Sequence, residues 1–441
     1  MKRYDTYKDS GVEWIGEIPS HWFCVGTNKV YNDLGTGTTP TSDNTEYYSD
    51  NGYHWITTTD LNEGIMYDTL SKITKKSVED YPNLRLYPSG SIYISMYGGR
   101  IGKLGVSTFD SYCNQSVCVL PKNDKIIVKF FYYWFLGFQE FVKGMGRGGG
   151  QPNINKDMIK SFPTVKIPLT EQQQIVSFLD TKTLLIDSLI EKTQRKIELL
   201  KEKRTSLINE VVTKGLNPNV EMKDSGVEWI GEIPSHWSLK KIGYVSKLLT
   251  GNPWKSDLFD FESGIKIVRG ENVSEGFLRW GSRTRFWKEE VEENSIFYLK
   301  EGDIIIGMDG SKVGKNFVRI NKVDLPLLLH QRMCRIRVYE GYESTKFIEY
   351  WIGSEMFRFY IDISKTDPMI PHITQKNIFD FKIPFPSFSE QQQIVSYLDE
   401  QTQLIDNTIS IEEKRIELLK EYRQSLISEV VTGKLKVTTD E

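Results

Sequence analysis

Two segments of the chain, residues 171–213 and 390–432, carry apolar side chains at the spacing of a coiled-coil seam. Eight of eleven seam positions are aliphatic in each segment, and neither segment contains glycine or proline. The seam of the first segment consists of Val176, Leu179, Thr183, Ile186, Ile190, Thr193, Ile197, Leu200, Arg204, Leu207 and Val211. The seam of the second consists of Val395, Leu398, Thr402, Ile405, Ile409, Glu412, Ile416, Leu419, Arg423, Leu426 and Val430. The pattern predicts two long helices that pair with each other, each extending roughly 64 Å at 1.5 Å per residue.

Elsewhere the apolar residues fall in short runs that Gly, Asn, Asp and Pro interrupt. Residues 90–96 and 302–308 are aromatic and β-branched runs of this kind, which are typical of short strands bounded by turns. Longer apolar patterns at residues 128–141 and 344–360 predict helices. The remainder of the chain is therefore expected to mix α and β structure.

The chain is internally duplicated. The string KDSGVEWIGEIPSHW, here called the box, occupies residues 8–22 and recurs unchanged at residues 223–237. Residues 23–165 and 238–385, the two heads, have similar lengths but share little sequence. Because the order box, head, helix occurs twice, the box and the long helix are repeated, whereas the two heads differ in sequence.

The predicted fold class is α+β, with two mixed α/β heads separated by a pair of long antiparallel coiled-coil helices in a pseudo-twofold internal repeat. The predicted domains are 1–165, with the first box and head; 166–222, with the first helix and linker; 223–385, with the second box and head; and 386–441, with the second helix.

Connectivity favours antiparallel pairing of the helices. A link of about ten residues joins the first helix to the second box and spans at most about 35 Å, which is too short to return along the helix. The second head should therefore lie at the far end, and the second helix should run back. Parallel pairing in register would also place Arg204 against Arg423, which is unfavourable.

Composition narrows the class of protein. The chain is 39% hydrophobic and 26% charged, which is typical of a folded protein, and its net charge of −3 excludes coating of nucleic acid by bulk positive charge. The four cysteines form no CxxC pair, which argues against a disulfide scaffold and against a metal site. No apolar stretch suits a signal peptide or membrane span. We therefore expect a cytoplasmic protein with no membrane partner.

The order of these elements resembles the specificity subunit of Type I restriction-modification systems over nearly the whole chain. The resemblance is carried by the two boxes, by the two helix starts EQQQIV…LD…ID, and by heads that lie where the family has target-recognition domains. It implies a non-catalytic subunit that binds double-stranded DNA at a bipartite asymmetric site. It also implies two methyltransferase subunits and ATP-dependent restriction subunits as partners. S-adenosylmethionine, ATP and Mg²⁺ would be held by those partners, and this chain would hold no cofactor.

Loops in both heads resemble the family and offer groups suited to DNA. Glycine permits close approach of the backbone, Lys and Arg neutralise phosphates, and Arg, Asn and Gln can bond to base edges. The DNA-binding candidates of the first head are Thr36, Thr38, Thr39, Tyr97, Arg100, Lys103, Asn114, Gln115, Arg147, Gln151 and Asn153. Those of the second head are Arg269, Asn272, Lys312, Lys315, Gln331 and Arg332. For each, a solvated surface or turn role is the alternative. The repeated Trp14/Trp229 and His21/His236 are assigned to packing or partner docking.

Two other classes of function remain as alternatives. A chain that itself methylates adenine would need an Asn/Asp-Pro-Pro-aromatic motif, and the nearest fragment, residues 252–254, lacks the second proline. No P-loop is present, since Asn316 follows Gly314-Lys315. A coiled-coil adaptor with two protein-binding heads is permitted by composition. DNA binding that depends on a methyltransferase partner would distinguish the specificity subunit from such an adaptor.

Overall fold

The computed structural model describes residues 3–31, 33–123, 126–146, 152–292, 295–340, 344–365 and 371–437. The chain divides into two compact units, Met1–Gln194 with Lys414–Glu441, and Arg195–Glu413. No helix among the described residues combines the length and the apolar character that crossing a membrane requires.

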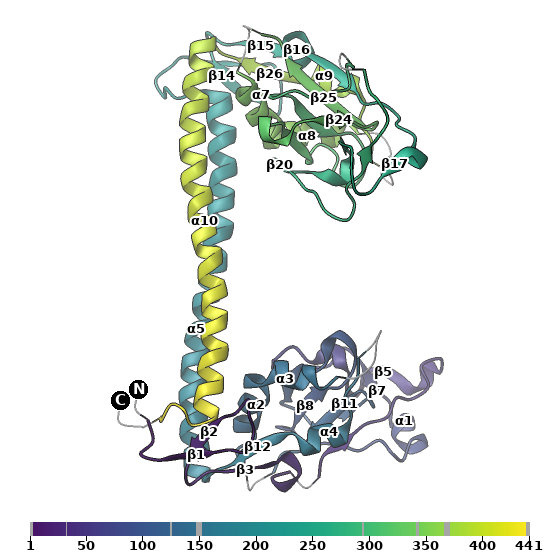
Figure 1. The fold of residues 1–441 in the computed structure, drawn as a ribbon, viewed down its shortest axis with the longest axis vertical. Helices are drawn as coiled ribbons and strands as arrows, with labels where there is room; N and C mark the ends of the chain where they lie inside the picture. Colours follow the sequence, from purple (N-terminus) through teal and green to yellow (C-terminus); the bar gives the residue numbers. More distant parts are fainter. Residues whose placement is uncertain are drawn as a thin grey trace. The chain divides into compact units, whose positions relative to one another are not determined.

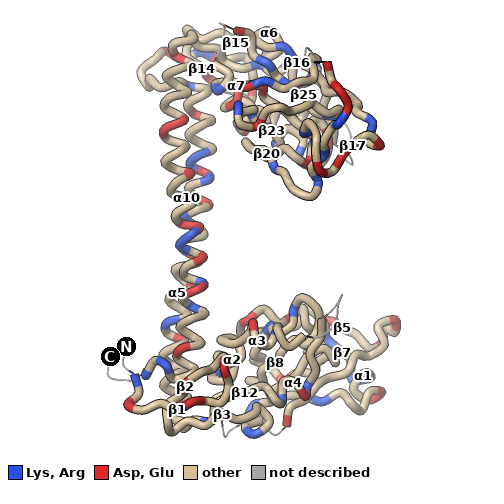
Figure 2. Tube along the Cα trace, viewed as in Figure 1, with Lys and Arg blue, Asp and Glu red and all other residues tan. Residues whose placement is uncertain are grey.

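The two long helices predicted from the seam pattern are confirmed as α5, Leu169–Lys214, and α10, Phe388–Val431 (Figure 1). The boundary between the units falls within both helices. All seam residues are buried or half-buried, and Leu179 and Val430 are completely buried. Figure 2 shows Lys and Arg interspersed with Asp and Glu along both helices. The apolar repeat therefore forms the contact face of each helix, and the charged residues occupy its solvent side.

The helices pair antiparallel within each unit. In the first unit, Arg423 Nε lies 2.9 Å from Asp187 Oδ1. In the second unit, Arg204 Nε lies 2.9 Å from Asp406 Oδ1. The two seam arginines thus each meet a carboxylate instead of stacking on one another, which agrees with the argument from the sequence.

The first unit builds its head on a pair of adjacent strands. The first box is a hairpin of β1 and β2, with Lys8 opposite Ile18. The chain enters the head through β3 and leaves it through β12, which pair antiparallel. One sheet of the head has the strand order β4-β11-β8-β9-β6 and the other has the order β10-β5-β7.

The strands of the first unit are β1 Tyr7–Asp9, β2 Glu17–Pro19, β3 Phe23–Gly26, β4 Gly35–Thr36, β5 Tyr48–Ile56, β6 Gly64–Met66, β7 Lys72–Ile73, β8 Ile92–Ser95, β9 Leu104–Ser107, β10 Tyr112–Cys113, β11 Val117–Leu120 and β12 Pro163–Lys166. Its shorter helices are α1 Lys75–Asp80, α2 Val128–Gly137, α3 Gln139–Gly144 and α4 Lys156–Ser161.

The second unit repeats this plan. The second box is a hairpin of β13 and β14, with Lys223 opposite Ile233, and the head lies between the paired strands β15 and β26. Its sheets have the strand orders β16-β25-β22-β23 and β17-β21-β18-β24, and β19 pairs with β20. The mixed α/β class predicted for both heads is therefore confirmed.

The strands of the second unit are β13 Met222–Asp224, β14 Glu232–Pro234, β15 Ser238–Lys241, β16 Ser246–Thr250, β17 Phe259–Asp260, β18 Ile265–Val268, β19 Val273–Ser274, β20 Phe277–Leu278, β21 Phe286–Trp287, β22 Ile304–Gly307, β23 Phe317–Arg319, β24 Leu327–Leu329, β25 Met333–Val338 and β26 Lys382–Phe385. Its shorter helices are α6 Ile242–Val245, α7 Thr345–Ile352, α8 Glu355–Ser364 and α9 Gln375–Asp380.

The two long apolar patterns predicted as single helices are each broken in two. In the first unit α2 ends at Gly137 because Gln424 of α10 donates its side-chain amide to the carbonyls of Leu136 (3.0 Å) and Gly137 (2.9 Å). In the second unit the Ser354 hydroxyl caps the start of α8, and Asn209 of α5 accepts from the Glu355 backbone N–H at 3.1 Å. Both breaks occur where a long helix contacts the head.

Each box is fastened to the first turn of a long helix by one glutamate. Trp22 Nε1 donates to Glu171 Oε2 at 3.0 Å, and His21 Nε2 lies 2.7 Å from Glu171 Oε1. In the second unit Trp237 Nε1 donates to Glu390 Oε1 at 3.0 Å, and His236 lies 3.2 Å from the same carboxylate.

The aromatic residues of the boxes also pack on the heads. Trp14 stacks on Phe141 and Phe162 in the first unit. Trp229 contacts Phe359 and Tyr360 in the second. Packing, one of the two roles predicted for these residues, is therefore confirmed for the repeated tryptophans, whereas the exposed histidines contact Glu171 and Glu390.

We expect Glu171→Ala to destabilise the first unit by about 1–3 kcal/mol, because the completely buried Trp22 loses the acceptor of its indole N–H. Thermal unfolding measures the effect. Glu171→Gln keeps an acceptor oxygen and should cost less, and Glu390→Ala should give a matching loss in the second unit. Equal unfolding temperatures for wild type and Glu171→Ala would contradict a stabilising role of the Glu171–Trp22 hydrogen bond.

Candidate nucleic-acid interface

Loops at 36–41, 57–63, 97–103, 114–116 and 152–155 are joined by backbone hydrogen bonds in the first head, and we call them the first loop cluster. The connecting bonds run from Thr38 N to Cys113 O (3.0 Å), Asn114 N to Ile56 O (3.0 Å), Met96 N to Ser116 O (2.9 Å) and Ile154 N to Met96 O (2.9 Å). The candidate residues that the structure describes in this head are therefore gathered into one region, although they span more than 100 positions of sequence.

The second head has the same pattern of backbone hydrogen bonds between loops, and we call this pattern the frame. Its loops lie at 251–255, 269–273, 309–315, 330–332 and 371–374, and we call them the second loop cluster. Its bonds run from Asn252 N to Leu329 O (3.2 Å), His330 N to Val268 O (3.2 Å), Met308 N to Arg332 O (3.0 Å) and Ile373 N to Met308 O (2.9 Å). Isolated bridges join Tyr97 with Asn153 in the first head and Asp309 with His372 in the second.

This shared frame shows which positions correspond. Tyr97 corresponds to Asp309, Ser116 to Arg332, and Asn153 to His372, whereas Gln115 and Gln331 correspond and are identical. One backbone arrangement thus presents different side chains in the two heads.

Several candidates of the first head have exposed side chains. Tyr97, Gln115 and Asn153 are exposed. Thr36, Thr38 and Thr39 are half-buried, and the Thr39 hydroxyl donates to the Gln115 side-chain carbonyl. Arg147 and Gln151 lie outside the described residues.

The side chains of other candidates in the first head are engaged in hydrogen bonds or ion pairs with groups of the head itself. The Arg100 guanidinium donates to the backbone carbonyls of Thr58 (2.7 Å) and Leu61 (2.9 Å), and the Lys103 ammonium pairs with the Glu63 carboxylate. Asn114 Oδ1 accepts from the backbone N–H of Ser116 at 3.1 Å. These side chains hold the loops in place.

In the second head, Arg269, Gln331 and Arg332 line one cavity of about 360 Å³ together with Gly270, Glu271, Gly307, Asp309 and His330. Arg269 Nη1 lies 2.9 Å from Glu271 Oε1. Lys312 and Lys315 are exposed on the neighbouring loop. Asn272 is only 2% exposed, and its amide accepts from Arg269 N and donates to Arg279 O, each at 3.2 Å.

The second cluster mixes charges of both signs. Burial lowers the pKa of His330, and the positive charges of Arg269 and Arg332 lower it further. His330 is therefore neutral near pH 7. Its Nδ1 lies 2.9 Å from the Gln331 backbone carbonyl, which can only accept, so Nε2 is left as an acceptor. The cluster offers donors and acceptors together, which suits base edges as well as phosphates.

Three further residues of the second cluster are not predicted from the sequence. Asp309 contacts the candidate Arg332, Glu271 contacts the candidate Arg269, and His372 contacts Asp309. The signal for Asp309 and His372 is their correspondence with Tyr97 and Asn153, which becomes visible only when the two heads are compared by their hydrogen bonds.

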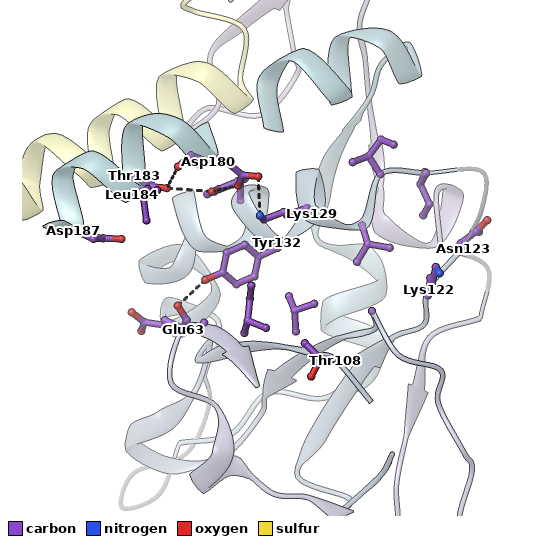
Figure 3. Close-up of a pocket in the computed structure, with 18 of the residues that line it drawn as sticks. Glu63, Thr108, Lys122, Asn123, Lys129, Tyr132, Asp180, Thr183, Leu184 and Asp187 are labelled. Atoms are coloured by element: carbon purple, nitrogen blue, oxygen red, sulfur yellow. Dashed lines mark hydrogen bonds and ion pairs between the residues drawn. The ribbon is translucent and has the colours of Figure 1, made fainter. Parts of the chain in front are cut away.

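A separate cavity of about 770 Å³ lies between the first head and the long helices of the first unit (Figure 3). Its lining is largely apolar; Tyr132 OH donates to Glu63 O at 2.7 Å, and Lys129 Nζ lies 2.7 Å from Asp180 Oδ2. None of the candidates that the structure describes lines this cavity. In the described part of the chain, no group of three or more His, Cys, Asp or Glu side chains is placed to hold a metal ion.

The family model for the Type I restriction modification DNA specificity domain matches residues 31–200 and 234–421. The MjaVIII specificity subunit of Methanocaldococcus jannaschii, a Type I restriction enzyme subunit, is 26% identical over 388 residues, covering 87% of this chain and 86% of the relative. The MjaIX specificity subunit of the same organism is 24% identical over 437 residues, covering 96% and 95%.

Solved structures share the fold. The HsdS subunit from Thermoanaerobacter tengcongensis has a TM-score of 0.55 at 16% identity, covering 95% of this chain and 98% of that one. A chain from a structural study of assembly and conformational transition of the type I R-M system has a TM-score of 0.73 at 16% identity, covering 95% and 99%.

Proposed function

The chain belongs to the Type I restriction-modification DNA specificity family, and we propose that it recognises a bipartite, asymmetric DNA sequence through its two loop clusters. The observation that supports this most directly is the shared frame with different side chains. Recognition of two different half-sites requires the same approach to the groove with different contacts to base edges.

We propose that the exposed and cavity-lining candidates, together with the half-buried threonines of the first head, contact DNA. They are Thr36, Thr38, Thr39, Tyr97, Gln115 and Asn153 in the first cluster, with Arg147 and Gln151 beside them in sequence, and Arg269, Lys312, Lys315, Gln331 and Arg332 in the second. The engaged candidates Arg100, Lys103, Asn114 and Asn272 position the loops that carry these contacts. Local groups thus replace the bulk positive charge that the chain lacks.

The long helices are the proposed docking surface for two methyltransferase subunits. On α10, Leu404, Ile411 and Leu418 recur every seven residues and are 55%, 68% and 53% exposed. Leu184 and Leu185 of α5 are also exposed. An apolar stripe beside a paired seam fits helices of a partner. Restriction subunits would join this complex, and S-adenosylmethionine, ATP and Mg²⁺ would be bound by the partners.

We expect the full chain, co-expressed with its methyltransferase partner, to direct adenine methylation to one bipartite sequence, and the purified chain alone to show no methylation, ATPase or cleavage. The physical reason is that the motifs these reactions need are missing from the sequence. Sequencing of modified bases, together with methyl-transfer and ATPase assays, measures both parts.

Methylation by the lone polypeptide would contradict the non-catalytic assignment. A stable complex with the methyltransferase that binds DNA without sequence preference would instead support an adaptor with protein-binding heads.

A further inference from the structure

Arg332 is held in an unusual backbone conformation at the turn that joins β24 to β25. Its φ is +66°, a region that few residues other than glycine adopt. Its carbonyl accepts from Met308 N at 3.0 Å, and the preceding Gln331 N donates to Asn252 O at 2.8 Å. Such a conformation persists where the surroundings determine it, and it is common at binding sites.

The Arg332 side chain contacts the carboxylate of Asp309, and His372 holds that carboxylate in place. Arg332 Nε lies 3.3 Å from Asp309 Oδ2, and His372 Nδ1 contacts the other carboxylate oxygen, Oδ1. The backbones of Asp309 and His372 are joined by a β-bridge, and the Asp309 side chain is mostly buried. Because each carboxylate oxygen has a partner, Asp309 fixes the direction of the guanidinium.

The donating end of Arg332 remains available. The side chain is 73% exposed, and within the described ranges it makes no hydrogen bond or ion pair other than the one from Nε. Its two terminal Nη groups can therefore serve an external partner. Two N–H donors in one plane match two adjacent acceptors in one plane.

We propose that Arg332, oriented by Asp309 and His372, recognises one guanine in the half-site bound by the second head, donating from its Nη groups to O6 and N7. This inference rests on the proposed function. Arg332 is the specificity-determining residue, and Asp309 and His372 are positioning residues that act through it.

Guanine fits this arrangement better than a phosphate does. The adjacent Asp309 carboxylate offsets the positive charge of Arg332 and would repel a phosphate, whereas it does not oppose the neutral edge of a base. The exposed Lys312 and Lys315 of the neighbouring loop are better suited to phosphates. A fixed guanidinium also matches the major-groove edge of guanine, the commonest specific partner of arginine.

The first head lacks these groups on the same frame. Ser116, Tyr97 and Asn153 stand where the second head has Arg332, Asp309 and His372. The guanine requirement should therefore belong to the second half-site alone, which gives every experiment an internal control within the same DNA sequence.

The test co-expresses the full chain and its variants with the methyltransferase partner and sequences the methylated adenines. Exchange of the second head first identifies the half-site that this head recognises. We expect Arg332→Ala and Arg332→Lys to reduce the preference for guanine at one position of that half-site by about 5- to 150-fold, with the other half-site unchanged. We expect Asp309→Asn and His372→Gln to reduce the same preference by a smaller factor, because they loosen the arginine without removing it.

Two controls separate base recognition from other effects. Lys322→Ala changes an exposed lysine of the same head outside the loop cluster and should leave the methylated sequence unchanged. Thermal unfolding of Arg332→Ala should match that of wild type, because the side chain is largely exposed.

A uniform loss of methylation by Arg332→Ala across all sequences would assign the residue to a phosphate and overturn the proposal, as would an unchanged requirement for guanine. If the wild-type complex marks a bipartite sequence with no guanine in the second half-site, this inference fails while the proposed function stands. If the wild-type complex marks no bipartite sequence, the proposed function fails.

Discussion

Replacement of residues 23–165 by the head of a related protein is expected to change one half of the methylated DNA sequence completely and to leave the other half unchanged. In the present chain those residues form the first head, which holds the whole first loop cluster. The second cluster, at residues 251–374, is built from other strands and has its own core.

The base of each head explains why such an exchange should preserve folding. Strands β3 and β12 pair with Phe23 opposite Lys166, and strands β15 and β26 pair with Ser238 opposite Phe385. The chain therefore enters and leaves each head at neighbouring points. A foreign head has to match these two short paired strands and the contacts that Trp14 of the box and Gln424 of α10 make with the head, while the Glu171–Trp22 hydrogen bond stays intact.

Sequencing of modified bases in cells that express the exchanged chain with the methyltransferase partner measures the outcome. The reciprocal exchange of residues 238–385 is the matched control and should alter the opposite half. Changed bases in both halves after a single exchange would contradict independent recognition by the two heads.

The long helices could be predicted from the sequence because their pattern is local. Seam residues such as Leu179 and Leu398 follow a repeat that any helix of this sequence must bury, and both are completely buried. The antiparallel sense followed from chain length and from the charge on Arg204 and Arg423. These properties do not depend on how the heads fold.

The ends of the shorter helices and the roles of single polar residues could not be predicted, because they depend on distant contacts. The break after α2 is stabilised by Gln424, which is 287 positions from Gly137. The charge and geometry of Arg100 predict a contact with DNA, yet its guanidinium donates to the carbonyl of Thr58, 42 positions away. Residue type shows what a side chain can bind, whereas the fold decides what lies next to it.

The pair of Asp309 and His372 illustrates the same limit at the site. The two residues lie 63 positions apart and meet only because the frame joins their loops. In the first head the same frame joins Tyr97 and Asn153, so the backbone bridge is a property of the fold, and the chemistry is a property of the individual head.

The largest change in specificity is expected from residues 1–222 expressed alone with the methyltransferase partner. This half-chain should form a dimer and mark a palindrome in which the half-site of the first head occurs on both sides. Closed association of identical units gives a twofold axis, and a twofold protein recognises an inverted repeat.

The first unit shows why the half-chain can pair. The end of α10, with Leu426, Ile427, Val430 and Val431, packs with Trp22 of the first box. The end of α5 has the same residue types at corresponding positions, in Leu207, Ile208, Val211 and Val212, and packs with the identical second box. The end of α5 from one copy can thus replace α10 on the box of the other.

Some contacts of the intact chain would be lost in this dimer. Lys196 pairs with Glu412 at 2.6 Å, and the residue corresponding to Glu412 is Thr193, so this ion pair disappears. Gln424, which holds the end of α2, is replaced by Thr205. The Lys196 ammonium is exposed but the Glu412 side chain is buried, so loss of the pair also removes a buried carboxylate and its desolvation cost. The aliphatic seam is retained, so we expect pairing to persist at reduced stability.

The Asp187–Arg423 pair supplies a sharp test, since Arg204 takes the place of Arg423 in the dimer. Arg204→Asp in the half-chain should weaken dimerisation by placing two carboxylates together, and the double variant Asp187→Arg with Arg204→Asp should restore it. Sedimentation measures the association, and sequencing of modified bases identifies the site. A stable, active half-chain that still marks an asymmetric sequence would overturn the assignment of one half-site to each head.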